Sequence, residues 1–222
     1  MNTSEAYDRY LIKTEKNSTN DNISTDKQRF VEQYNEYQIR FLEYFYDRKN
    51  TDDFRYIESL LIPAKRLDKS DRKSEYYSFN LPNNYFNLSS VYALGSKGNC
   101  KNKKIDLLIE LNDINKDFYL SDEFSRPSFE YRESLYTIAS NNVNVYYTDF
   151  NIDSLILSYY RYPKKLRLQN PDNPESDFDD SFELDFDEKS INRIISATAG
   201  GFDINNNSDR WQLHNNFSKK DL

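Results

Sequence analysis

Residues able to carry nucleophilic or metal chemistry are few in this chain of 222 residues. The sequence has one histidine, His214, and one cysteine, Cys100. A Ser-His or Cys-His pair, or a histidine metal site, would depend on His214 alone. A single thiol can build neither a disulfide framework nor a thiolate zinc site. We therefore interpret His214 as an exposed polar residue and Cys100 as an ordinary exposed thiol.

A cluster of carboxylates offers the other chemistry to consider. It comprises Asp177, Asp179, Asp180, Glu183 and Asp185. These acids lack the spacing of a calcium-binding loop, so a solvated acidic face is the preferred interpretation. Glycoside hydrolysis needs paired carboxylates at a fixed separation, which sequence alone does not supply. The glycine pairs at 95/98 and 200/201 match neither phosphate-binding fingerprint. The sequence thus predicts no catalytic centre, no metal and no cofactor, and a protein that is not an enzyme.

The most unusual local feature is a run of basic residues. The segment Gly95–Lys104, GSKGNCKNKK, contains Lys97, Lys101, Lys103 and Lys104 and no acid. It can be an exposed hairpin tip kept soluble by charge, or a docking finger for an acidic partner surface or DNA phosphate. The formal net charge of −7 argues against a nucleic-acid-binding surface spread over the whole protein.

Helices are predicted at the N-terminal end. Thr3–Thr14 has an apolar stripe, and Asp26–Asn50 has aromatic residues at helical spacing. We expect that stripe to pack within the chain rather than between subunits. Thr51 then starts a second helix that ends at Pro63, which would complete a helical hairpin. The stripe of the long helix consists of Phe30, Tyr34, Tyr37, Phe41 and Tyr44.

A sheet is predicted after a charged linker at 65–75. Alternation of apolar and polar residues indicates strands from Tyr76 to Leu81, at 91–94 and at 105–111. The stretch 133–163 has three alternating segments separated by polar corners, the first of them at Asn141-Asn142, and it predicts a three-stranded antiparallel meander. A further strand is expected at Phe182–Phe186.

The C-terminal region combines a helix and a tail. Asp187 can cap a helix whose isoleucines face inward and which ends at Gly200-Gly201. The remaining tail is polar but contains Trp211, Leu213 and Phe217, which we expect to pack on a neighbouring subunit. No signal sequence or apolar run of membrane-spanning length is apparent, so we expect a soluble chain without a membrane anchor, made in the cytoplasm.

The predicted fold class is therefore α+β. An antiparallel sheet or sandwich is packed by an N-terminal helical hairpin and a C-terminal helix. The expected division is a helical region at 1–75, a β-rich core at 76–187, and a C-terminal helix with an extended tail at 188–222.

The order of several segments resembles the neck and tail ring, or adaptor, proteins of crAss-like tailed phages that infect gut Bacteroidota. The similarity extends over roughly Ser24 to Gly201, and the signal is the ordered set rather than any single motif. The segments are TDKQRFVEQYN, DDFRYIESLL, FNLPNNYF, YALGSKGNCKNKK, RPSFEYRESLY, NVNVYYTDFNIDSLILSYYRYP and DEKSINRIISATA.

This resemblance implies a non-enzymatic virion protein. Such a subunit would form a dodecameric ring around the DNA exit channel below the portal of a short-tailed phage, stacked on the portal or on another ring. DNA would pass through the lumen without sequence-specific binding. Other possibilities are a capsid-attached or tail-fibre-attached protein and, from a different class, a glycan-binding or glycan-cleaving tail module.

Overall fold

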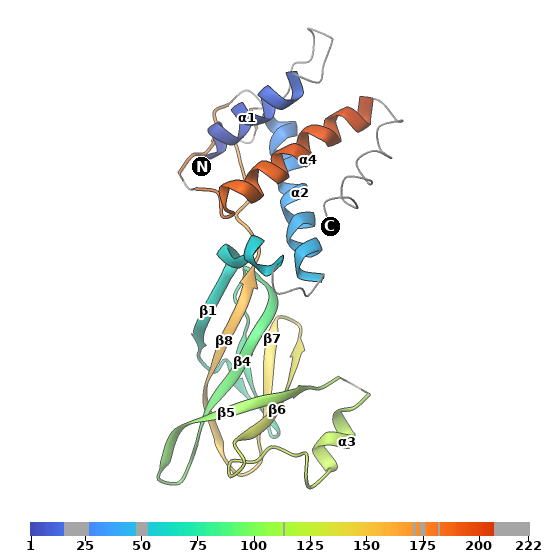
Figure 1. Cartoon of the computed structure of the whole chain (residues 1–222). Helices are drawn as coiled ribbons and strands as arrows, with labels where there is room; N and C mark the ends of the chain where they lie inside the picture. The colour runs from blue at the N-terminus through green and yellow to red at the C-terminus, as the bar shows by residue number, and fades with distance from the viewer. Residues whose placement is uncertain are drawn as a thin grey trace. The chain divides into compact units, whose positions relative to one another are not determined.

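The computed structural model describes residues 1–15, 27–47, 53–112, 114–170, 172–173, 176–181 and 183–206 (Figure 1). The chain forms two compact units. The helical unit is built from the described parts of residues 1–60 and 163–222, and the sheet unit from residues 61–162. Helices at both ends and an eight-stranded, mostly antiparallel curled sheet confirm the predicted α+β class.

Three helices pack together in the helical unit: α1 (Thr3–Glu15), α2 (Lys27–Asp47) and α4 (Glu188–Asn206). Their shared core is aromatic. The ring of Phe30 lies 4.9 Å from that of Tyr10 and 5.2 Å from that of Tyr7, and Tyr7 lies 5.0 Å from Phe178. Ile191, Ile194 and Ile195 of α4 are buried, as their spacing predicts.

The aromatic stripe of α2 packs within the chain, as expected, but its burial decreases toward the C-terminal end of the helix. Phe30 and Tyr34 are fully buried, whereas Tyr44 is 41% exposed. The buried face continues instead through Leu42 and Phe45. Residues spaced seven apart drift by about 20° per heptad around a straight helix, so a stripe of this period turns away from the core.

Side chains of α2 also hold the extended segment that follows the sheet unit. The amide of Asn35 donates to the Leu166 carbonyl at 2.9 Å and accepts from the Leu166 N–H at 2.8 Å. The amide of Gln38 donates to the Lys164 carbonyl at 3.1 Å. These bonds satisfy backbone groups of Lys164 and Leu166, which lie outside any strand or bridge.

The N-terminus of α1 is capped by a distant carboxylate. Asp180 Oδ1 accepts from the backbone N–H groups of Thr3 (2.9 Å) and Ser4 (3.0 Å), while Asn2 and Glu5 form a reciprocal capping box. Asp180 therefore accepts hydrogen bonds from N–H groups that the helix leaves unpaired. Its negative charge is also favourable at the positive end of the helix dipole.

We expect Asp180→Ala to lower the free energy of unfolding by about 1 kcal/mol, because two N-terminal amides lose their acceptor. Asp180→Asn retains an acceptor oxygen and should lose less. Urea unfolding followed by far-UV circular dichroism measures both variants. Equal losses for Ala and Asn would show that the negative charge, rather than the hydrogen bonds, accounts for the effect.

Four local predictions about the chain are wrong. The second helix at 51–63 is replaced, over its described residues, by two 3₁₀ turns, η1 (Asp53–Tyr56) and η2 (Glu58–Leu60), and by the start of strand β1 (Leu61–Leu67). Pro63 fits this edge strand because the pairing register shifts between Ile62 and Lys65. The supposed linker at 65–75 thus contains the last three residues of β1 and strand β2 (Asp71–Arg72).

The other two wrong predictions concern the C-terminal region. Residues 183–187 form no strand; their alternation arises because Leu184 and Phe186 are buried in the helical unit, where Phe186 lies 5.5 Å from Phe41. Helix α4 does not end at Gly200-Gly201 but continues to Asn206. Its start is as predicted: Asp187 Oδ1 accepts from the Ser190 N–H at 2.7 Å.

The sheet unit is a single sheet with strand order β1-β8-β4-β5-β6-β7-β3-β2. Neighbouring strands are antiparallel except β5 and β6, which are parallel and joined by a long connection containing the short helix α3 (Lys116–Ser121). The remaining strands are β3 (Tyr76–Asn80), β4 (Tyr85–Lys97), β5 (Cys100–Glu110), β6 (Glu133–Ala139), β7 (Asn142–Tyr146) and β8 (Asn151–Arg161).

The predicted meander at 133–163 is correct in its three strands but wrong in its pairing. β6 and β7 form a hairpin whose turn residues, Ser140 and Asn141, both have positive φ (48° and 68°). β7 then pairs with β3, and β8 pairs with β4 and β1. Alternation specifies which face of each strand is buried, but it does not specify the neighbouring strand.

Candidate functional site

The β4–β5 hairpin is the element that carries the lysine-rich segment. Its strands are joined by Gly98 and Asn99, and Gly98 has a φ of 57°, a conformation that glycine adopts without strain. β5 holds one extra residue beside the turn, since Gly95 pairs with Lys103 and Lys97 with Cys100, and Asn102 there has a φ of 53°. Most of the predicted loop is therefore strand, and the hairpin tip consists of the turn and the first residues of β5, 98–103 (Figure 1).

The four lysines have different surroundings. Lys97 Nζ lies 2.5 Å from Asp149 Oδ2 and 3.5 Å from Glu130 Oε1, and the hydrogen bond to Asp149 raises the pKa of Lys97. Lys104 Nζ lies 2.6 Å from Asp106 and 5.2 Å from the centre of the Tyr92 ring.

Lys101 and Lys103 stand apart from these two ion-paired lysines. Both are exposed, and neither has an ion-pair partner among the residues that the structure describes. Cys100, next to the turn, is an exposed free thiol. The tip of the hairpin therefore carries two uncompensated positive charges and one exposed thiol.

A pocket of about 780 Å³ lies beside the turn end of this hairpin, where Lys97 is the hairpin residue that lines it. Its walls come from the connection between α3 and β6 and from the residues between β7 and β8. Four carboxylates line it, against two cations, Lys97 and Arg126. Lys97 lowers the pKa of Asp149 mainly by its hydrogen bond. The carboxylates are Glu123, Glu130, Glu133 and Asp149.

The walls of this pocket are fixed by hydrogen bonds. Ser128 and Glu133 exchange two backbone bonds of 2.9 and 3.0 Å, which closes the loop that carries Glu130 and Tyr131. The Thr148 hydroxyl donates to the Pro127 carbonyl at 2.9 Å and ties that loop to the corner after β7. The pocket is therefore preformed rather than dependent on an occupant.

Large apolar side chains are exposed on and near the pocket. Phe124 is 94% exposed and Tyr131 79% exposed, and both line it. Among the described residues, five of the eight exposed large hydrophobic side chains belong to the stretch from Leu108 to Tyr131. Exposed apolar side chains of this size make the stretch a candidate for contact with a partner. The other three of the five are Leu108, Ile114 and Phe118.

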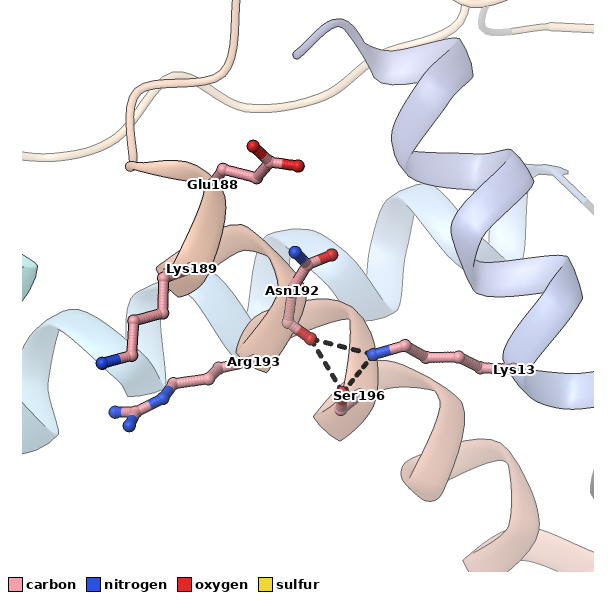
Figure 2. Close-up of a pocket in the computed structure, with 6 residues that line it drawn as sticks. All are labelled: Lys13, Glu188, Lys189, Asn192, Arg193 and Ser196. Carbon is pink, nitrogen blue, oxygen red and sulfur yellow. Dashed lines mark hydrogen bonds between the residues drawn. The ribbon is translucent and has the colours of Figure 1, made fainter.

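A second, shallower pocket of about 580 Å³ lies between α1 and α4 (Figure 2). Lys13 of α1 reaches α4, where its Nζ donates to the Asn192 carbonyl at 3.2 Å and to the Ser196 hydroxyl. Burial, and secondarily the charge of Arg9, lowers the pKa of Lys13. A lysine with a lowered pKa beside a serine is the combination that a Ser-Lys nucleophile pair would use.

The hydrogen bonds favour a structural role for this pair. The Ser196 hydroxyl donates to the Asn192 carbonyl at 2.7 Å, so its proton points away from Lys13. Arg9, one turn before Lys13, binds Glu188 and Asn192 of α4 at 2.7 and 3.0 Å. In Figure 2 Lys189 and Arg193 point away from Lys13. The contacts of Arg9 and Lys13 with α4 therefore join α1 to α4.

The acidic cluster of the sequence is largely engaged in contacts within the helical unit. Asp180 caps α1, and Asp177 pairs with Lys27 at 3.4 Å. Hydrogen bonds from Ser181 and Arg167 lower the pKa of Asp179 to about 2. Asp185 accepts from the Lys164 N–H at 2.6 Å. Asp177, Asp180 and Glu183 are also exposed, so the cluster is solvated while four of its acids hold contacts within the fold.

Four residues singled out in the sequence cannot be placed in the structure. His214, Trp211, Leu213 and Phe217 lie outside the described residues. Within the described part of the chain, no group of three or more His, Cys, Asp or Glu side chains is arranged to hold a metal ion. No helix in that part is long and apolar enough to cross a membrane.

Sequence reasoning identified the hairpin but missed the pocket. Glu130 and Asp149 are distant from Lys97 in the chain, so the sequence does not show that these residues meet. The available signal for the pocket was the segment FEYRE (129–133), which combines two glutamates with two aromatic residues. Comparison with models of known protein families finds no match to this chain, and comparison with curated protein sequences finds none either.

Proposed function

We propose that this chain is a structural subunit of a tailed-phage virion. It forms a homo-oligomeric ring, a dodecamer by the family resemblance, in the neck or tail of a short-tailed phage. The ring surrounds the DNA exit channel below the portal and contacts the portal protein or other ring proteins. The ordered set of motifs between Ser24 and Gly201 supports the phage assignment.

The observation that carries the assembly part of this proposal is the exposed apolar surface of the sheet unit. Ile114 is 93% exposed and Phe118 67% exposed, in addition to Phe124 and Tyr131 of the pocket. Leaving such side chains in water is unfavourable, since covering apolar area stabilises by about 25 cal/mol per Å². A partner that covers these residues would remove that cost, as in a subunit that functions within an assembly.

The charge of the chain is compatible with DNA passing through such a ring. A net charge of −7 per subunit repels phosphate, so DNA would slide past without being held. The ring would be assembled in the bacterial host cytoplasm and retained in the virion.

The expected result for the purified chain is a ring of high mass. Native mass spectrometry should give one dominant oligomer, and negative-stain images should show a closed ring with a central opening. A chain that remains monomeric at concentrations of about 10 µM, well above the Kd of stable subunit contacts, would contradict the proposal. A monodisperse monomer that cleaves polysaccharide would contradict it as well.

A second candidate, a glycan-binding or glycan-cleaving tail module, has its own supporting observation. Phe124 and Tyr131 border a pocket lined by carboxylates, and aromatic rings beside polar groups can bind sugars. A cleaving enzyme would require a carboxylic acid with a raised pKa, whereas Lys97 lowers the pKa of Asp149. Binding or release of reducing ends on capsule polysaccharide, lost in Tyr131→Ala, would favour this candidate.

A further inference from the structure

We infer that the β4–β5 hairpin of one copy of this chain binds the acidic pocket of a second copy. This inference rests on the proposed function in that it requires the chain to self-assemble. It goes further because it assigns the two surfaces that meet: residues 98–103 at the hairpin tip, and the pocket that contains Glu130 and Glu133.

Charge complementarity identifies the occupant. The pocket has four carboxylates against two cations, which leaves two negative charges uncompensated. The hairpin tip has two lysines, Lys101 and Lys103, that lack an ion-pair partner among the described residues. Complementary charges of this kind set the register of an interface and exclude wrong partners.

The hairpin of the same molecule does not supply these charges. Only Lys97, at the end of β4, lines the pocket, and it is already bound to Asp149 and Glu130. Lys101 and Lys103 are not among the lining residues. The pocket therefore has room for a lysine-bearing segment that comes from elsewhere.

The apolar part of the pocket suits the same occupant. Lysine stems are aliphatic and pack on apolar surface while the ammonium remains on carboxylates. Phe124 and Tyr131, both highly exposed, present such surface at the pocket, and a tyrosine ring also attracts an ammonium group. A DNA backbone would match the lysines but not the carboxylates beside them, and the net charge of −7 opposes it.

A two-population cross-link tests the contact directly, because Cys100 is the only cysteine in the chain and lies at the hairpin tip. A tagged donor copy keeps Cys100. An untagged acceptor copy carries Cys100→Ser with Glu130→Cys. The two are mixed under dissociating conditions, reassembled and oxidised mildly. A disulfide requires Cα atoms within about 7 Å, so we expect a tagged–untagged dimer on a non-reducing gel.

The matched control places the acceptor cysteine away from the pocket. Cys100→Ser with Asn83→Cys uses an exposed residue in the β3–β4 turn and should give at least tenfold less mixed disulfide. Equal yields from the two acceptors would overturn the inference.

Charge exchange provides a second, independent test. Lys101→Glu with Lys103→Glu should weaken assembly about tenfold or more, and so should Glu130→Lys with Glu133→Lys. A variant with all four changes should assemble like the original chain, because the charges of the hairpin and the pocket are then exchanged and still complementary. Circular dichroism of each variant verifies folding.

The outcomes separate this contact from the proposed function. Rings that form equally well from both charge-reversed variants would leave the virion role standing and eliminate the hairpin contact. A chain that never oligomerises would remove both. A hairpin that binds DNA in a salt-dependent way, with no mixed disulfide, would overturn the inference in favour of a phosphate ligand.

Discussion

Phe30→Ala should lower the free energy of unfolding of the helical unit by about 3–5 kcal/mol, the usual cost of removing a fully buried phenyl ring. Phe30 has no exposed surface and lies within 4.9–6.1 Å, ring to ring, of four other aromatic side chains on α1, α2 and the segment after the sheet unit. The cavity would therefore loosen several elements at once.

The control for this prediction is Tyr44→Ala on the same helix. Tyr44 is 41% exposed, so its loss should cost far less than that of Phe30. Far-UV circular dichroism in urea is the appropriate measurement, because the only tryptophan lies outside the described residues. Similar losses for the two variants would mean that burial does not decrease along the stripe.

The second large effect is expected in the sheet unit. Leu155 of β8 has no exposed surface, and Leu155→Ala should lower the free energy of unfolding by about 2–5 kcal/mol. β8 pairs with both β4 and β1, so a cavity there disturbs a strand that has neighbours on both sides rather than an edge strand.

Leu108→Ala is the matched control, because it makes the same chemical change at a side chain that is 57% exposed. Its effect on unfolding should be within about 0.5 kcal/mol of zero. In assembly the expectation is the reverse. Leu108→Ala is expected to weaken self-association, which sedimentation velocity measures. A loss of stability at Leu108 equal to that at Leu155 would contradict the assignment of the exposed face.

The sequence allowed the fold class to be predicted because its strands and helices have strong periodicity. Val143 and Val145 alternate with polar residues, and both are buried in β7. Ile191, Ile194 and Ile195 of α4 recur at helical spacing and are buried. Local periodicity of this kind reflects burial directly, so it identifies an element without knowledge of its neighbours.

Other features could not be predicted because they depend on contacts between distant segments. Leu184 and Phe186 alternate like a strand, yet they are buried by packing beside α2 without any strand pairing. The second predicted helix failed because Phe54, Ile57 and Leu60 fit a helical face as well as they fit short 3₁₀ turns leading into β1. The acidic pocket was missed for the same reason, since Lys97 meets Glu130 and Asp149 only in the folded sheet.

The pairing of β1 with β8 has a consequence for how the protein is made. Leu61 and Tyr160, at the two ends of the sheet unit, are direct partners, so this unit is a closed insertion whose ends meet. Such a segment can complete its folding during synthesis once its last strand emerges from the ribosome. The helical unit cannot, because α4 is translated after the sheet unit. The apolar faces of α1 and α2 therefore stay uncovered until α4 has been synthesised. During this period binding by chaperones would protect the chain most against aggregation.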